Sequence, residues 1–211
     1  MIVGQIAQLN LLPVAGVAGA PGAAKPHVAH NSGNNEWYTP SQFIEAARAV
    51  LGSVDLDPAS SETANRTVRA STFYNAQDDG LQQFWRGKVW MNPPYSGDLV
   101  GRFVGKLLAH YRAGDVPEAI VLVNNATETE WFQRLAAAAS ALCFPKGRVR
   151  FLDVQERPIG VPLQGQAFLY LGEHPECFSI VFADFGFVLV NPSPSLGSFV
   201  EGESFTFSFK E

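Results

Sequence analysis

The segment EAIVLVN, residues 118–124, is a continuous run of apolar and β-branched residues that ends in an asparagine. An uninterrupted run of this length is typical of a strand buried on both faces, because a half-exposed strand alternates apolar and polar residues. Helices must then cover both faces of the sheet that contains it. The segment therefore predicts an α/β fold with a mostly parallel sheet.

Helices and strands alternate on both sides of this segment. In the first helix, Thr39 is placed as the N-cap, Pro40 as the first helical residue and Gln42 as the partner in a capping box, and Gly52 ends it. Further on, Ser96 is a candidate cap for the helix that follows the proline-rich corner. The helices are expected at 39–51, 62–70, 96–111 and 128–140, and the strands at 53–57, 87–92, 118–124 and 141–144.

After residue 148 the pattern changes to strands joined by turns. Apolar runs at 148–152, 166–172 and 179–190 predict an antiparallel C-terminal edge of the sheet. Residues 1–35, rich in Ala, Gly, Pro and Asn and without an acidic residue, are expected to form a weakly ordered leader. The predicted organisation is this leader, one α/β domain over 36–190, and a tail or edge strand over 191–211.

Composition narrows the class of protein. The chain has 211 residues, with 15 Lys and Arg against 20 Asp and Glu, so its formal charge is −5. This balance argues against a surface that binds nucleic acid everywhere, although it allows a local basic rim. The two cysteines, Cys143 and Cys177, have no second ligand nearby and predict neither a disulfide framework nor a zinc site, which favours a reducing compartment. We expect no signal peptide and no membrane span.

Three polar clusters follow predicted strands: DLDPAS at 55–60, NPPY at 92–95 and VNNAT at 123–127. In an open α/β sheet, ligands bind outside the carboxyl ends of the strands, so the clusters predict one site. Asp57 either forms a local turn beside Pro58 or presents a carboxylate to the ammonium or hydroxyl groups of a small ligand. Glycine-rich dinucleotide and P-loop motifs are absent from the sequence.

The corner NPPY, residues 92–95, indicates a site that activates an amino group as a nucleophile. An amino group on an aromatic base has its lone pair delocalised into the ring, and two acceptors that draw its hydrogens make it more nucleophilic. The Asn92 side-chain oxygen and the Pro93 carbonyl can be those acceptors, and Pro94 restricts Pro93 to an extended conformation. Tyr95 can stack on the base. The alternative is a rigid loop in which Tyr95 is a packed cover.

Five stretches in order, NEWYTP, DLDPASSETAN, DDGLQQFWRGKVWMNPPYS, TETEWFQRL and GRVRF, resemble the phage-type DNA adenine-N6 methyltransferases. The resemblance extends over residues 35–171. NPPY alone is less specific, because protein-glutamine and ribosomal-RNA methyltransferases are similar there. The resemblance implies a Rossmann-like fold, S-adenosyl-L-methionine as the methyl donor, DNA as the partner, and a phage or prophage protein in the bacterial cytoplasm.

The resemblance also implies site residues. The catalytic corner would be Asn92, Pro93, Pro94 and Tyr95. Three groups would contact the donor: Trp37, Thr39 and Pro40 over its methionine part, Asp57, Pro58 and Ala59 at its amino group, and Asp79 at its adenine. The sequence departs from the family in having serines after Asp57 instead of glycines, and Asp55 and Glu62 are guesses for a ribose-binding acid. No metal is expected.

Two alternatives to adenine methylation remain open from the residues. The chain could methylate another planar amine or amide, such as cytosine N4 or a protein glutamine, or it could be a non-catalytic relic that binds donor or DNA. Target recognition has one candidate region, the basic stretch Lys146, Arg148 and Arg150, near Arg134 and Arg157 in the sequence. It is either a phosphate contact or a solvated edge strand.

Overall fold

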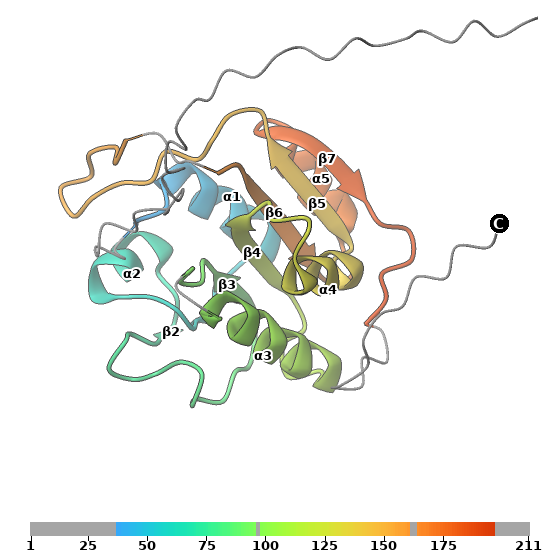
Figure 1. Ribbon diagram of the computed structural model, residues 1–211, viewed down its shortest axis with the longest axis horizontal. Coiled ribbons are helices and arrows are strands. Elements are labelled where there is room, and N and C mark those ends of the chain that lie inside the picture. The colour runs from blue at the N-terminus through green and yellow to red at the C-terminus, as the bar shows by residue number, and fades with distance from the viewer. Residues whose placement is uncertain (1–36, 96–97, 161–163, 197–211) are drawn as a thin grey trace, which may run out of the picture. The chain divides into compact units, whose positions relative to one another are not determined.

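The computed structural model of the chain describes residues 37–95, 98–160 and 164–196. Within these residues a seven-stranded sheet has the order β2-β1-β3-β4-β6-β5-β7 (Figure 1). The strands are β1 (Leu56–Asp57), β2 (Thr72–Phe73), β3 (Val89–Met91), β4 (Ala119–Asn124), β5 (Ala141–Pro145), β6 (Gln166–Leu171) and β7 (Gly186–Val190). The helices are α1 (Ser41–Leu51), α2 (Glu62–Val68), α3 (Leu99–Ala113), α4 (Glu130–Ala138) and α5 (Pro175–Phe182).

Strands β2, β1, β3 and β4 pair in parallel, whereas β6 is antiparallel to both β4 and β5, and β7 is antiparallel to β5. The Rossmann-like α/β fold with a mostly parallel sheet is therefore confirmed. The expected antiparallel C-terminal edge is also confirmed, because β6, β5 and β7 lie together at one side of the sheet, with β6 innermost and β7 outermost. Every residue of β6 is buried, as a position with strands on both sides and helices on both faces requires.

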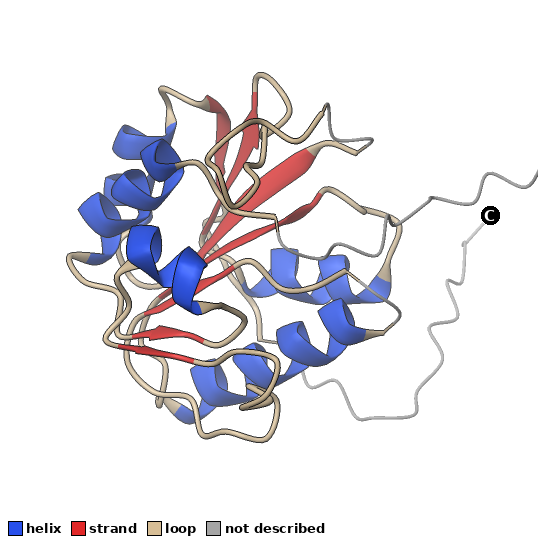
Figure 2. Ribbon diagram, turned by 90° about the vertical axis from the view of Figure 1, so that its left-hand side faces the viewer, coloured by secondary structure: helices blue, strands red, loops and turns tan. Residues whose placement is uncertain are grey.

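Helices cover both faces of the sheet, as Figure 2 shows. Side chains of β4 alternate between the two layers: Val121 and Val123 pack in the cluster that includes α3 and α4, and Ile120 and Leu122 pack in the one that includes α1 and α5. The apolar run at 118–124 thus has the doubly buried environment that its sequence predicts. No helix in the described part of the chain is long and apolar enough to cross a membrane.

One of the expected C-terminal strands is absent, and another, at 179–190, is a strand only in its second half, β7. Residues 148–152 form no strand, and only Leu152 makes isolated bridges, to Tyr38 and to Pro158. The first part of the run 179–190 belongs to helix α5, in which Phe178 and Phe182 lie one turn apart with their rings stacked at 4.2 Å. Pro175 suits the first turn of this helix. The buried aromatic face of the helix, and not the β-branched residues in it, decides the local structure.

Strand β2 has only two residues and was not expected from the sequence. It explains the topology of the site, because the chain leaves β1 for β2 on one side and then crosses to β3 on the other. The order of the sheet therefore reverses at β1, and ligands bind at such a switch point. Residues 191–196 form no strand, while the leader, Ser96 and residues 197–211 lie outside the described residues.

Candidate functional site

The carboxyl ends of β1 and β3 bring two of the three polar clusters together. Asp57 is the last residue of β1, and Asn92 follows Met91, the last residue of β3. The two strands are paired neighbours, with Leu56 opposite Val89. The switch point of the sheet therefore carries both the buried carboxylate and the Asn-Pro-Pro-Tyr corner.

In the side-chain amide of Asn92, the nitrogen has a hydrogen-bond partner among the described residues and the oxygen has none. Its Nδ2 donates to Thr39 Oγ1 at 3.4 Å. Its Oδ1 is buried and has no hydrogen-bond partner among the described residues. Buried polar atoms are almost always hydrogen-bonded, so this oxygen is a candidate acceptor for a ligand.

Thr39 does not cap the first helix, which corrects the expectation by one residue. The N-cap of α1 is Pro40, the helix begins at Ser41, and Phe43 N donates to the Pro40 carbonyl oxygen at 3.1 Å. Thr39 Oγ1 contacts the Asn92 amide instead. Thr39 therefore orients the acceptor of the candidate site, a contact that no local sequence pattern encodes.

Tyr95 is anchored to the neighbouring strand. Its hydroxyl donates to the Leu122 carbonyl oxygen at 3.3 Å, and its ring packs against the core on the α3 side of the sheet. Burial raises the pKa of the Tyr95 hydroxyl above its usual value. Pro93 is buried and Pro94 partly so. The corner is thus rigid, with its aromatic side chain fixed at the far end.

Asp57 is a buried carboxylate without a cation. It is 3% exposed, and Oδ1 accepts one backbone hydrogen bond, from Ala59 N at 3.2 Å. Burial raises its pKa to about 6, and the Ser60 hydroxyl and the Ala59 N–H act in the opposite direction. Within the described chain, no Lys or Arg side chain forms an ion pair with Asp57. The local turn at Asp57 is therefore present, and the binding of a ligand by its carboxylate stays a prediction.

The segment around Asp79 lies against the Asp57 turn. Gly80 packs so closely on this turn that a Cβ there would overlap the Pro58 carbonyl oxygen. Asp79 itself is exposed, has a φ of 48°, and its Oδ1 accepts Leu81 N at 3.1 Å. The structure thus brings these two predicted donor-contacting segments side by side.

Trp37 and Tyr38 join the start of the described chain to the β5–β6 connection. Tyr38 and Leu152 exchange two backbone hydrogen bonds, of 3.0 and 2.8 Å. The Trp37 ring lies 5.6 Å from Phe151 and remains 38% exposed. Since Thr39 contacts Asn92, the segment 37–40, here called the strap, lies beside the Asn-Pro-Pro-Tyr corner.

Sequence reasoning missed other polar groups at this rim. Because β2 was missed, so were Tyr74 and Asn75 at its carboxyl end, and Tyr74 N donates to the Asp57 carbonyl oxygen at 3.0 Å. Gln166, 4% exposed, accepts Val149 N at 2.9 Å and donates to Asn124 of the third cluster at 3.4 Å. Short strands and contacts between distant segments leave no periodic signal that could have revealed them.

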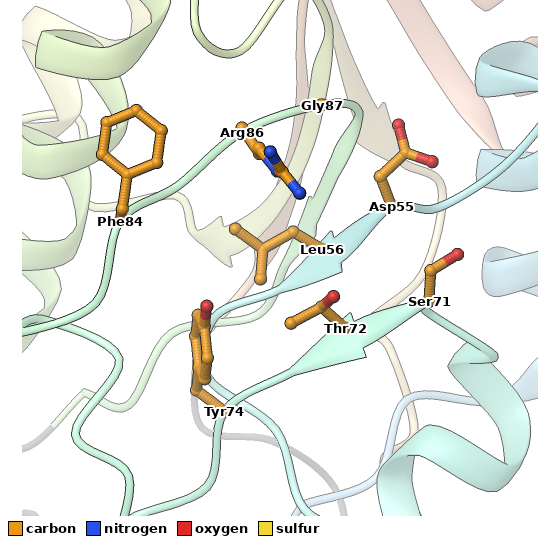
Figure 3. Close-up of a pocket in the computed structure, with 8 residues that line it drawn as sticks. All are labelled: Asp55, Leu56, Ser71, Thr72, Tyr74, Phe84, Arg86 and Gly87. Atoms are coloured by element: carbon orange, nitrogen blue, oxygen red, sulfur yellow. The ribbon is translucent and has the colours of Figure 1, made fainter.

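Asp55 lies at the opposite end of β1 from Asp57. Its Oδ2 accepts Lys88 N at 2.8 Å, so it joins the starts of two strands and is removed from the carboxyl rim. A hollow of about 420 Å³ lies beside β1 and β2 (Figure 3). It is lined by Asp55, Leu56, Ser71, Thr72, Tyr74, Phe84, Arg86 and Gly87. This hollow is separate from the Asn92 corner, and the guess of Asp55 as a ribose-binding acid loses its support.

Metal ligands and cysteine thiols are the other groups in the described residues that could carry catalysis. No three His, Cys, Asp or Glu side chains gather there as metal ligands. Both cysteines are free, and burial raises the pKa of Cys143 to about 11. A thiol with so high a pKa is a poor nucleophile at neutral pH.

A Rossmann-like sheet with a buried acid after its first strand and an Asn-Pro-Pro-Tyr corner after β3 has the fold of the α/β methyltransferases. Comparison with protein families identifies the branch. The family described as DNA N-6-adenine-methyltransferase (Dam) matches residues 27–162, more than half of the chain. The protein belongs to this family. No curated protein matches the chain.

Proposed function

We propose that the protein transfers a methyl group from S-adenosyl-L-methionine to the N6 amine of adenine in DNA, by direct in-line attack of the amine. The observation that carries this proposal is the buried, unpartnered Oδ1 of Asn92 at the switch point of the sheet. Membership of the Dam family supports adenine in DNA over cytosine N4 and protein glutamine, the other planar amines and amides considered.

Asn92 is the proposed acceptor for one hydrogen of the adenine amine. With Nδ2 donating to Thr39, the amide oxygen keeps its lone pairs for an incoming N–H. The Pro93 carbonyl is the proposed second acceptor. Two fixed acceptors draw the amine toward tetrahedral geometry and cost no reorganisation when charge develops on nitrogen.

Tyr95 is the proposed platform for the adenine ring. Stacking contributes about 1–3 kcal/mol per base, which offsets much of the cost of extruding a base from a duplex. Because the Tyr95 hydroxyl is bound to β4, the ring is already ordered before a base arrives. Pro93 and Pro94 hold the backbone of the corner between acceptor and platform.

The described residues fit the proposed donor. S-Adenosyl-L-methionine supplies an electrophilic methyl group and carries positive charge on its ammonium and sulfonium groups. Asp57, buried and without a cationic partner, would hold its amino group together with the Pro58–Ala59 turn. Trp37, Thr39 and Pro40 would cover the methionine part, and Asp79 would contact the adenine. No covalent enzyme intermediate is needed, in keeping with the raised pKa of Cys143.

The test is a transfer assay with methyl-labelled S-adenosyl-L-methionine and adenine-containing DNA. We expect label in N6-methyladenine, and we expect Asn92→Ala to lower turnover by at least about 100-fold while donor affinity changes little, because one acceptor in such a site is worth this much. Asn191→Ala, which removes an amide at the far edge of the sheet, is the control. Label in N4-methylcytosine or in protein would favour the alternatives, and donor binding without transfer would favour a relic.

A further inference from the structure

The β5–β6 connection carries a small closed hairpin, residues 151–159. Ile159 N donates to the Phe151 carbonyl oxygen at 2.8 Å, and Asp153 N donates to the Arg157 carbonyl oxygen at 2.9 Å. Across the turn the Arg157 guanidinium pairs with the Asp153 carboxylate at 2.8 Å. The segment is therefore an ordered projection, visible in Figure 1 as the gold loop beyond the start of α1.

The base of this hairpin lies next to the catalytic corner. Leu152 exchanges two backbone hydrogen bonds with Tyr38, and the next residue, Thr39, contacts Asn92. On its other side Val149 is bound to the side chain of Gln166, which lies opposite Asn124 at the carboxyl end of β4. The hairpin thus leaves the protein at the rim where the target base must enter.

The exposed residues of the hairpin and its approach suit DNA. Val149 and Phe151 are buried in the core, so Arg150 between them faces solvent, and it has no ion pair among the described residues. Residues 146–157 carry four basic and two acidic side chains, a net charge of +2 against −5 for the whole chain. Arg157 is paired with Asp153 within the turn, so the phosphate contact proposed below is assigned to Arg150.

The tip presents groups that can meet base edges. Val154 is 51% exposed, so its side chain is accessible to a ligand that approaches the tip. Gln155 is also exposed, and its Oε1 accepts from Arg157 Nη2 at 2.9 Å. Its amide N–H groups are therefore the ones available to a base acceptor, and Val154 can contact a thymine methyl group.

We propose that the hairpin 151–159 reads the DNA beside the target adenine, with Arg150 on a phosphate and Val154 and Gln155 at base edges. This inference rests on the proposed function, because it assumes that DNA enters at the Asn92 rim. Sequence specificity then comes from a short element attached to the strap over the site, and phosphate contacts from Arg150 set its register.

Two measurements test it on the full chain. The first is the salt dependence of binding to a fluorescent DNA duplex of random sequence. Arg150→Ala should lower affinity and reduce the slope of log K against log salt by about 1, as loss of one phosphate contact predicts. Arg86→Ala, which removes an exposed arginine at the amino ends of the strands, should leave the slope unchanged.

The second measurement is the set of methylated sequence contexts produced on plasmid DNA. The double variant Val154→Ala, Gln155→Ala should change these contexts or lower kcat/KM at the preferred one by at least about fivefold. Donor affinity and thermal midpoint should not change, and Ile180→Ala, another exposed aliphatic side chain, should behave as wild type.

The proposal is overturned if Arg150→Ala keeps the wild-type salt slope and the tip variant methylates the same contexts at the same rate. The binding measurement needs no turnover. It therefore still tests the proposed DNA contact if the wild-type protein transfers no methyl group to adenine. In that case the proposed function fails, and the slopes for Arg150→Ala and Arg86→Ala decide the hairpin by themselves.

Discussion

At the scale of single residues, the candidate site combines two buried polar groups, an amide oxygen and a carboxylate, whose hydrogen-bonding capacity the described residues leave partly unfilled. Asn92 Oδ1 has no partner among the described residues, and Asp57 accepts one backbone N–H and faces no cation. Each is unfavourable in the free protein, because burial removes water without replacing all of its interactions. Such local costs are expected where a ligand completes the structure.

Asp57→Asn tests this cost through pH. Because burial raises the pKa of Asp57 to about 6, the folded state binds its proton more tightly than the unfolded state does. The penalty is therefore absent below about pH 4, grows between pH 4 and 6, and is complete above pH 6. We expect the asparagine variant to match wild type near pH 4 and to gain at most about 3 kcal/mol of unfolding free energy at pH 7–8.

The same substitution should separate stability from binding. Wild-type affinity for S-adenosyl-L-methionine should rise as pH increases through about 6, because the ionised carboxylate attracts the cationic donor. The asparagine variant should bind more weakly and lose this dependence. Calorimetric titration and denaturant unfolding over pH 4–8 measure both effects, and a variant that keeps the wild-type affinity profile would exclude Asp57 from the donor site.

Two variants of Tyr95 separate its contribution to stability from its proposed stacking on the base. Tyr95→Phe loses the hydrogen bond to the Leu122 carbonyl, which should cost about 1 kcal/mol of stability, but keeps a ring that can stack. Tyr95→Ala loses the ring on which the base would stack. The activation free energy of transfer should therefore rise by about 1–3 kcal/mol, the contribution of stacking. Equal transfer rates for the two variants after correction for folded fraction would show that Tyr95 is only a cover.

At the scale of elements, the contact between the Asp57 turn and the segment after Asp79 joins the two parts of the proposed donor site. Gly80 is the point of closest approach, where a Cβ would overlap the Pro58 carbonyl oxygen. Gly80→Ala should therefore cost about 1–3 kcal/mol of stability and weaken donor binding, because backbone on one side must move.

Gly105→Ala is the matched control for this prediction. Gly105 lies within α3, and a Cβ there would meet nothing within 4 Å. Alanine favours a helix over glycine, so this variant should be more stable by about 0.5–1 kcal/mol, with unchanged donor affinity. Thermal or denaturant unfolding compares the pair, and a neutral Gly80→Ala would show that the two segments do not depend on close packing.

Elements also show how far sequence reasoning extends. Long runs with a clear period, such as those of α3 and β4, were predicted correctly, because burial on one face or on two leaves a pattern in the residues. Strand β2 has two residues and therefore no period, and α5 contains a short apolar run that suits helix or strand equally. Tertiary packing of Phe178 and Phe182 resolved that ambiguity.

The site was predictable to a similar degree. Placing Asp57 and Asn92 after strands was enough to expect them at one edge of the sheet, and the structure puts them on paired neighbours. The contacts that hold them come from residues far away in the chain, as with Thr39 on Asn92 and Leu152 on Tyr38. Such contacts depend on the fold as a whole, so no motif announces them.

At the scale of the whole molecule, one sheet order explains why these segments meet. The order of the strands reverses at β1. The strap 37–40 lies beside the corner after β3, because Thr39 contacts Asn92. The β5–β6 connection returns to the same rim, where Leu152 pairs with Tyr38. The acidic net charge is compatible with DNA binding because positive residues gather in residues 146–157 at this rim. Membership of the Dam family and the geometry of the corner lead to the same chemistry.

The most direct test of the proposed adenine methylation uses cells that lack adenine methylation of their own and express the protein. Their DNA is sequenced by a method that identifies methylated positions. We expect N6-methyladenine at one recurrent sequence context with the wild-type chain, and its loss with Asn92→Ala at equal protein levels. N6-methyladenine that persists at wild-type levels with Asn92→Ala would contradict the central role given to Asn92, and unmethylated DNA from the wild-type strain would contradict the proposed activity itself.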